Sequence, residues 1–371
     1  MTCAIAFVKV QLSDNPLGKK VLPLTAAIRV LLLVSAVATG AFCMGAAASD
    51  LNLQSRISAL VTEDFTVASD TPGIQLYVRN KRPPQSMAKT RVLLYVHGAT
   101  YPASTAFDLV LDGMSWMDYI AAHGWDVYLM DLRGYGRSTR PSEMEQPAED
   151  NAPIVTTDVA IRDVATVVNA IMKRRNVAKV SLLGWSWGTS IMAAYTAAHN
   201  ELVDNLVLYA PLWLRTTPSV IGGDGPLGAY RLVTKESARK RWLNGVPENK
   251  QADLIPQGWF EAWAAATWET DPKAGNGGLR APNGVIQDVR RYWASGKPYY
   301  DPAAIRVPVM LIKAEWDQDT PAYMAQALFS LLNNAPAKRY VEIGEGTHSV
   351  IMEKNRLQLF QEVQLFLDEN Q

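Results

Sequence analysis

The segment VSLLGWSWGTS, residues 180–190, passes from apolar strand-forming residues into a glycine-flanked serine and then into small, helix-compatible residues. A serine in this pattern indicates a nucleophile when it lies at a sharp turn from a strand to a helix, because that turn places its hydroxyl above the end of a sheet. Gly184 and Gly188 stand where such a crowded turn tolerates no side chain. A glycine-rich nucleotide-binding turn is the weaker alternative, because no G-x-G-x-x-G or G-K-[ST] pattern accompanies it. The segment therefore predicts a nucleophilic Ser186.

Short apolar runs suited to β-strands recur on both sides of this segment. They fall near residues 65–69, 74–79, 91–97, 126–131, 179–185, 205–211, 307–317 and 338–343. The later runs are continuous in Val, Leu, Ile and Tyr, which is typical of strands covered by helices on both faces. Helical patterns separate the runs, as in residues 158–175. Because strand and helix alternate, we predict an α/β fold with a mostly parallel eight-stranded sheet flanked by helices.

The alternation stops between residues 212 and 300. This stretch holds three helix-like pieces, near 236–243, 257–267 and 284–294, with Gly/Pro/Asn turns between them and no convincing strand. An insertion of this length between two sheet strands is most simply a helical cap. The predicted divisions of the chain are a leader at 1–48, the first part of the core at 49–211, the cap at 212–300 and the second part of the core at 301–371.

The composition points to a small or uncharged ligand. Lys plus Arg equal Asp plus Glu, at 36 each, so no strong electrostatic field favours nucleic acid or an anionic surface. Nucleic acid is therefore not an expected partner. The sequence predicts no particular oligomeric state.

The first 48 residues have the order of a secretory signal. Basic residues up to Arg29 precede an uncharged run at 30–49, which begins VLLLV and fades into small residues, with the simplest cleavage site after Ala48. The alternative is a retained anchor helix, although the Ala/Gly-rich second half suits a membrane span poorly. We expect an exported protein, periplasmic or secreted, with no stable membrane insertion after processing. Cys3 and Cys43, the only cysteines, lie in this segment, so the mature chain would have no disulfide and no cysteine-ligated metal.

A serine nucleophile needs a neighbouring base, and only four histidines are available. His123 ends a predicted helix, and His199 lies about 20 Å along the helix that begins at Ser186, so neither reaches the serine. His97 precedes a glycine in a loop that suits a backbone oxyanion donor better than a base. His348, in the glycine-rich segment GEGTHS, remains as the candidate base.

The base in turn needs a carboxylate to orient it. The segment LIKAEWDQDTP places Glu315, Asp317 and Asp319 directly after a strand. Thr320 and Pro321 resemble the cap and first position of the next helix, so Asp319 is expected to be a helix-terminal charge. Asp317 is the better candidate for the orienting acid.

The nucleophile, acid and base thus follow one another as Ser186, Asp317 and His348. With the motifs HGAT, DLRGYGRS, GWSWG, AEWD and GTHS in sequence, this order resembles the α/β-hydrolase fold superfamily over most of residues 60–370. The resemblance implies the α/β-hydrolase fold with an inserted cap, and a serine hydrolase of the esterase and lipase type. It implies no metal or organic cofactor.

The same resemblance assigns further residues. The backbone N–H groups of Trp187 and Ala99 would form the oxyanion hole, with a contribution from Thr100. In DLRGYGRS, the polar side chains are expected to brace a turn and to take no part in catalysis; they are Asp131, Arg133 and Ser138.

Tryptophans next to the serine and in the cap predict the substrate pocket. Trp185 flanks Ser186, and Trp259 and Trp263 are four residues apart on one face of a cap helix. We therefore expect an apolar, partly aromatic pocket that binds carboxylic esters of small to medium apolar or aromatic compounds.

Three other functions stay open on the sequence. An amidase or proline-iminopeptidase-like aminopeptidase would need cap carboxylates for an α-amino group, and Glu261 and Glu269 are available. A carbon–carbon bond hydrolase is a second alternative, which export disfavours. A non-catalytic ligand-binding relative is the third, since a fold does not fix a function.

Overall fold

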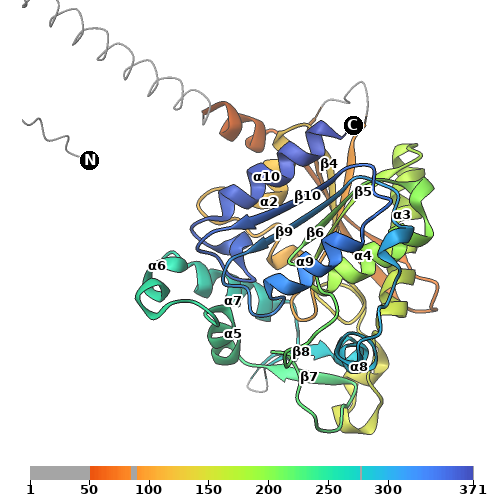
Figure 1. Ribbon diagram of the computed structural model, residues 1–371, viewed down its shortest axis with the longest axis vertical. Coiled ribbons are helices and arrows are strands. Elements are labelled where there is room, and N and C mark those ends of the chain that lie inside the picture. The colour runs from red at the N-terminus through yellow and green to blue at the C-terminus, as the bar shows by residue number, and fades with distance from the viewer. Residues whose placement is uncertain (1–50, 85–89, 276–277, 371) are drawn as a thin grey trace, which may run out of the picture. The chain divides into compact units, whose positions relative to one another are not determined.

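The computed structural model describes residues 51–84, 90–275 and 278–370 (Figure 1). The chain forms two units, residues 1–54 and 55–371, and the fold below is that of the second. The predicted leader at 1–48, with Cys3, Cys43 and the cleavage site, lies outside the described residues. Among the residues that are described, no helix combines the length and apolar character needed to cross a bilayer.

Eight strands form the central sheet, in the spatial order β1-β2-β4-β3-β5-β6-β9-β10. Their bounds are β1 Val61–Ala68, β2 Gln75–Arg82, β3 Val92–Val96, β4 Asp126–Met130, β5 Val180–Trp185, β6 Val203–Tyr209, β9 Val309–Ala314 and β10 Lys338–Ile343. Strand β2 is antiparallel to both β1 and β4, and every other neighbouring pair is parallel. The predicted mostly parallel, eight-stranded sheet is thus confirmed.

Helices cover both faces of this sheet, as expected because β3, β4, β5 and β9 are buried throughout. Their bounds are α2 Trp116–Ala122, α3 Thr157–Arg175, α4 Trp187–Ala198, α9 Ala322–Leu331 and α10 Arg356–Glu369. Successive side chains of β3 point to opposite faces, so Leu94 joins the apolar cluster under α3, α4 and α9, whereas Leu93 joins the cluster under α2 and α10 (Figure 1). Short 3-10 turns complete the connections: Ala103–Thr105, Ser142–Glu145, Ala148–Asp150, Asn200–Leu202, Glu248–Lys250, Trp293–Ser295, Pro302–Ala304 and Val350–Met352.

The segment between β6 and β9 holds both helices and strands. Its elements are β7 Tyr230–Val233, α5 Lys235–Trp242, α6 Gln251–Leu254, α7 Trp259–Glu269, β8 Leu279–Pro282 and α8 Gly284–Arg291. Helices α5, α7 and α8 fall on the three predicted helical pieces. The expectation of no strand was wrong, because β7 and β8 pair antiparallel as a small second sheet. Each is four residues long and its partner is distant in sequence, so neither shows a strand period of its own.

Candidate active site

Ser186 lies at a sharp turn where β5 ends and α4 begins. Its φ of 57° is in a region that L-residues with a side chain rarely adopt. The flanking glycines permit this turn: a Cβ on Gly184 would lie 2.3 Å from the carbonyl oxygen of Gly188, and a Cβ on Gly188 would lie 2.6 Å from that of Val96. The backbone thus holds the hydroxyl-bearing residue in the strained position that the sequence motif predicts.

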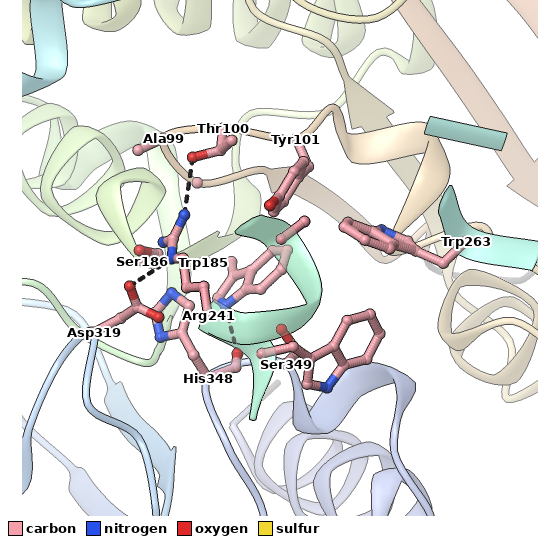
Figure 2. A pocket seen from close by; sticks show the side chains of 13 residues that line it. Ala99, Thr100, Tyr101, Trp185, Ser186, Arg241, Trp263, Asp319, His348 and Ser349 are labelled. Carbon is pink, nitrogen blue, oxygen red and sulfur yellow. Dashed lines mark hydrogen bonds and ion pairs between the residues drawn. The ribbon is translucent and has the colours of Figure 1, made fainter. Parts of the chain in front are cut away.

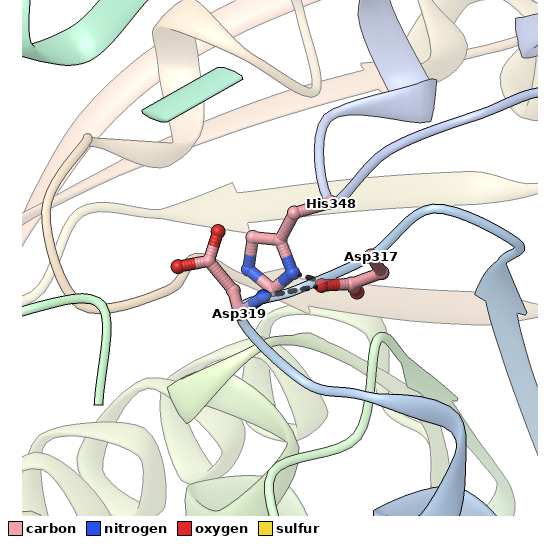
Figure 3. A group of neighbouring side chains, drawn as sticks. All are labelled: Asp317, Asp319 and His348. Carbon is pink, nitrogen blue, oxygen red and sulfur yellow. Dashed lines mark hydrogen bonds and ion pairs between the residues drawn. The ribbon is translucent and has the colours of Figure 1, made fainter. Parts of the chain in front are cut away.

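His348 and Asp317 form a buried hydrogen-bonded pair beside this turn (Figure 3). The Nδ1–H group of His348, in the loop after β10, donates to Oδ2 of Asp317, in the loop after β9, over 2.8 Å. Because Nδ1 is the donor, Nε2 is the ring nitrogen left to accept a proton. The side chains of His348 and Ser186 line one cavity, so the structure brings the three predicted residues together (Figure 2).

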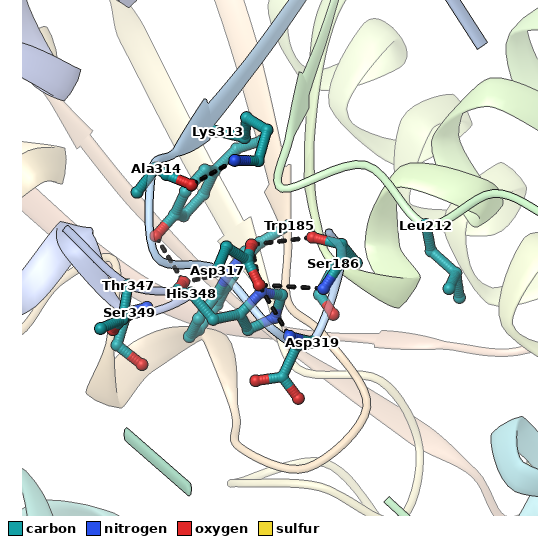
Figure 4. A network of polar contacts seen from close by, with 12 residues as sticks. Trp185, Ser186, Leu212, Lys313, Ala314, Asp317, Asp319, Thr347, His348 and Ser349 are labelled. Atoms are coloured by element: carbon teal, nitrogen blue, oxygen red, sulfur yellow. Dashed lines mark hydrogen bonds and ion pairs between the residues drawn. The ribbon is translucent and has the colours of Figure 1, made fainter. Parts of the chain in front are cut away.

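The carboxylate of Asp317 is held by further donors in its own loop (Figure 4). The N–H groups of Asp319 and Thr320 each donate to Oδ1 over 2.9 Å, and the Thr320 hydroxyl donates to Oδ2 over 2.8 Å. Burial by itself would raise the pKa of Asp317, but the charge of His348 and these hydrogen bonds outweigh it and lower the pKa. Burial would likewise lower the pKa of His348, yet the charges of Asp317 and Asp319 raise it above its ordinary value.

Asp319 corrects the prediction of a helix-terminal charge. Helix α9 begins only at Ala322. The Asp319 carboxylate instead turns towards the cavity, where its Oδ1 accepts a hydrogen bond from Nε of Arg241 over 2.8 Å (Figure 2). Asp317, Asp319 and His348 each have one atom of a kind that can ligate a metal ion, and these three atoms lie within 4.8 Å of one another. Both carboxylates are already hydrogen-bonded to a basic side chain, which suits an acid–base site.

The loop after β3 supplies the candidate oxyanion donor. His97 is buried, its Nδ1–H group donates to the carbonyl of Gly98 over 2.7 Å, and its Nε2 accepts from the N–H of Leu132 over 3.1 Å. Both ring nitrogens are therefore engaged, and burial lowers the pKa of His97, so this histidine is a neutral structural group and not the base. In a trans peptide the carbonyl and the N–H point in opposite directions. Holding the Gly98 carbonyl thus aims the Ala99 N–H away from it.

Trp187 contributes its backbone to the site and its side chain to the core. Its N–H lies in the first turn of α4, where helical N–H groups have no intrahelical acceptor. Its indole is fully buried and donates to the Thr157 hydroxyl over 2.9 Å. In the predicted bracing turn, Arg133 pairs with Asp163. There too, Asp131 accepts from the N–H of Ala103 over 2.8 Å.

Aromatic side chains form one wall of the cavity beside Ser186 (Figure 2). Thr100, Trp185 and Trp263 line it as predicted, together with Tyr101 and Trp242. The Trp185 indole donates to the carbonyl of His348 over 3.1 Å. Trp263 packs edge-on against Tyr101 at 4.7 Å and against Trp242 at 5.1 Å between ring centroids.

Trp259 does not line this cavity, which corrects its assignment to the pocket. Its ring lies under the guanidinium of Arg356, 4.5 Å from the ring centroid. Residues 259 and 263 share a helix face, as predicted, but one helical turn, about 5 Å along the axis, separates them. That turn carries Trp259 away from the serine and into contact with α10.

A buried carboxylate that the sequence did not reveal connects the segment between β6 and β9 to the loop that carries His348. Glu353 accepts from the Trp242 indole over 2.7 Å, from the N–H of Thr347 over 2.9 Å and from the Thr347 hydroxyl. Thr347 precedes His348, and Trp242 ends α5. Burial raises the pKa of Glu353 to about 7, although these three hydrogen bonds favour its ionised form.

Substituting Glu353→Gln should change how stability depends on pH. The folded pKa of about 7 exceeds the ordinary value of 4.5. Glu353 therefore favours the folded state at low pH, and this contribution is lost as pH rises through 7. Between pH 5 and pH 8 the unfolding free energy of the variant should gain about 2 kcal/mol relative to that of the unmodified protein. Urea unfolding of both proteins across this range measures the difference.

The substitution Glu269→Gln, at an exposed carboxylate of α7, provides the matched control. Its unfolding free energy should follow that of the unmodified protein at every pH. A constant difference for Glu353→Gln across the same range would show that Glu353 is ionised throughout and would contradict the prediction.

Comparison with known proteins agrees with this fold. A family model described as alpha/beta hydrolase fold matches residues 91–355. No curated protein matches the sequence. A solved membrane phospholipase A, described as a bacterial virulence factor, is 19% identical, with 93% of this chain and 98% of that chain covered and a TM-score of 0.52.

Two other solved structures give the same result. A serine hydrolase involved in carbazole degradation is 18% identical, with 83% and 99% covered and a TM-score of 0.56. An esterase from Thermogutta terrifontis is 15% identical, with 83% and 98% covered and a TM-score of 0.52. At these identities each likeness concerns the fold alone. The family match extends over most of the chain and includes all three residues of the candidate triad, and the chain belongs to the alpha/beta hydrolase fold family.

Proposed function

We propose that this alpha/beta hydrolase is a serine hydrolase that cleaves carboxylic esters through an acyl-enzyme at Ser186. The proposal rests on the arrangement of the residues that line one cavity. Ser186, on its strained turn, and His348 both face it, and Nδ1 of His348 is fixed by Asp317. A histidine held in this way can act as the base towards a serine hydroxyl that lines the same cavity.

The reaction follows from these positions. The Oγ atom of Ser186 attacks the ester carbonyl while Nε2 of His348 takes its proton, and the N–H groups of Trp187 and Ala99 donate to the oxyanion. The tetrahedral intermediate collapses, the alcohol leaves with the proton from His348, and the acyl group stays on Ser186. Water, deprotonated by His348, then releases the carboxylic acid and restores the serine. The Asp317 carboxylate stabilises the imidazolium in both steps.

The cavity favours a compact substrate. Beside Ser186 it measures about 30 Å³, which is room for a water molecule or two, and four aromatic side chains line it. Ligand pockets are usually larger, so we infer that the cap opens to admit an ester. The aromatic wall suits a small to medium acyl or aryl group.

The aminopeptidase alternative receives less support. Glu261 is exposed and pairs with Arg239, and Glu269 is also exposed. Neither lines the cavity beside Ser186.

The proposal also includes export, through removal of residues 1–48 near Ser49, and a small-molecule ester as the partner. Mass spectrometry of the exported protein tests this processing, and an intact amino terminus in a membrane fraction would favour an anchor.

A fluorophosphonate probe and a substrate series together test the proposed chemistry. The probe should label Ser186 stoichiometrically, because it reacts with a serine activated by a neighbouring base. Esters of p-nitrophenol with graded acyl chains should be hydrolysed at least tenfold faster, by kcat/KM, than p-nitroanilides of amino acids. An absence of labelling would support a non-catalytic relative. Labelling with a preference for the anilides would instead support the peptidase.

A further inference from the structure

Three arginines from the segment at 212–300 converge on the loops around Ser186. Arg231, on β7, donates to the carbonyl of Ala99 and to the hydroxyl of Thr100, both over 2.9 Å. Arg241, on α5, donates to the same hydroxyl over 3.1 Å (Figure 2). Arg215, which follows β6, donates to the carbonyl of Asp319 over 2.8 Å. The oxyanion loop and the acid loop therefore each contact guanidinium groups.

These positive charges are only partly balanced. Within the described part of the chain, Arg241 is the one member of the three with a carboxylate partner at ion-pair distance, Asp319. Arg215 and Arg231 donate to uncharged oxygen atoms. Burial lowers the pKa of Arg215, and it lowers the pKa of Arg231 to about 10. A cation removed from water without a counter-ion is costly, so the cluster is suited to an incoming anion.

A second cavity, of about 20 Å³, marks where this anion would bind once the cap opens. Ser186 lines it together with Arg215, Arg241 and Asp319. Aliphatic side chains complete its wall, among them Ile221, Val285 and Val289. Ser186 therefore faces two cavities, an aromatic one and one with two guanidinium groups, and the ion pair of Arg241 with Asp319 borders both.

We propose that the second cavity binds a carboxylate carried by the substrate, so that the preferred esters are anionic on one side of the scissile bond. This inference rests on the proposed ester hydrolysis at Ser186. It differs from the expectation of an apolar or aromatic ester, because Arg215 and Arg241 add positive charge beside Ser186.

Arg241 is suited to hold this carboxylate. Its Nε–H group donates to Asp319 and one terminal N–H group donates to Thr100, and the planar guanidinium matches a carboxylate in two-point contact. In the free protein Asp319 occupies one edge of this guanidinium and competes with the ligand. Arg215, buried on the same cavity, adds a second positive charge.

Matched ester pairs test the proposal through a ratio of kcat/KM values, anionic over neutral. One pair is 4-acetoxybenzoate and its methyl ester, which places the carboxylate on the alcohol side. The other is the 4-nitrophenyl monoester of adipate and 4-nitrophenyl hexanoate, which places it on the acyl side. The unmodified protein should favour the anionic member of one pair at least tenfold. A ratio does not depend on the fraction of protein that is folded.

Two substitutions should move the favoured ratio in opposite directions. Asp319→Asn removes the competing carboxylate and should raise the ratio about tenfold, whereas Arg241→Gln should reduce it to about one or less. A merely structural ion pair would give no such opposite changes. Arg239→Gln, two residues earlier on α5 at an exposed site, is the control and should leave the ratio unchanged.

Ratios at or below one for both pairs in the unmodified protein would overturn the anionic substrate, as would a lower ratio in Asp319→Asn. Fluorophosphonate labelling of Ser186 in the same preparation separates the two proposals. Labelling without an anionic preference refutes only the second cavity's role, and a failure to label refutes the ester hydrolysis on which it rests.

Discussion

Replacing Ser186 with alanine is expected to lower kcat by about 10⁵-fold to 10⁶-fold, with the free energy of unfolding changed by no more than about 1 kcal/mol. Alanine keeps the Cβ atom of serine, so the backbone at φ 57° experiences the same strain, and only the nucleophilic oxygen is lost. Rates of p-nitrophenyl ester hydrolysis and urea unfolding of the same preparations measure both quantities.

The control for this experiment is Ser349→Ala, which removes a hydroxyl from the same cavity. It should lose less than about tenfold in kcat, because this oxygen has no part in the proposed acyl transfer. His348→Ala should lose nearly as much as Ser186→Ala, and the double variant little more, since nucleophile and base act as one unit. Turnover near the unmodified rate in Ser186→Ala would refute the acyl-enzyme mechanism.

Local backbone chemistry explains why much of this site was predictable. The strand-to-helix turn at Ser186 requires glycine at positions 184 and 188, because nearby backbone leaves no room for a Cβ at either position. Glycines on both sides of a serine after an apolar run therefore predict this turn. His348 followed by elimination among four histidines. Asp317 followed from its place after a strand, since parallel strands bring their carboxyl ends to one edge of the sheet.

Contacts between distant segments could not be predicted from the sequence. Arg241 and Glu353 stand in polar, helix-like stretches where an exposed charge is the usual reading. Their roles depend on partners far along the chain, Asp319 for Arg241 and Trp242 for Glu353. The same limit explains the unpredicted pairing of β7 with β8, whose four-residue strands carry no readable period.

Helix α5 contacts all three loops that carry the candidate chemistry. Arg241 reaches the oxyanion loop through Thr100 and the acid loop through Asp319. Trp242, the next residue, reaches the base loop through Glu353. A movement of this helix to admit substrate would therefore change hydrogen bonds at all three loops together. Opening of the proposed cap would thus be linked to the arrangement of the candidate catalytic groups through two adjacent side chains.

The substitution Asp317→Asn is expected to lower kcat by about 10⁴-fold. An amide lacks the charge that stabilises the imidazolium, and its NH₂ group can favour the wrong tautomer of His348. The charge of Asp317 also raises the pKa of His348, so the pH at which kcat/KM rises should move downwards in the variant.

The matched control is Asp319→Asn, two residues along the same loop. The charge of Asp319 also raises the pKa of His348, so the pH profile of this variant should shift in the same direction. The kcat of this variant on a neutral ester should fall by no more than about tenfold, because Asp317 still fixes Nδ1 of His348. Complete pH profiles of kcat and kcat/KM for both variants distinguish the two carboxylates. A far larger loss of kcat in Asp319→Asn than in Asp317→Asn would identify Asp319 as the acid of the triad.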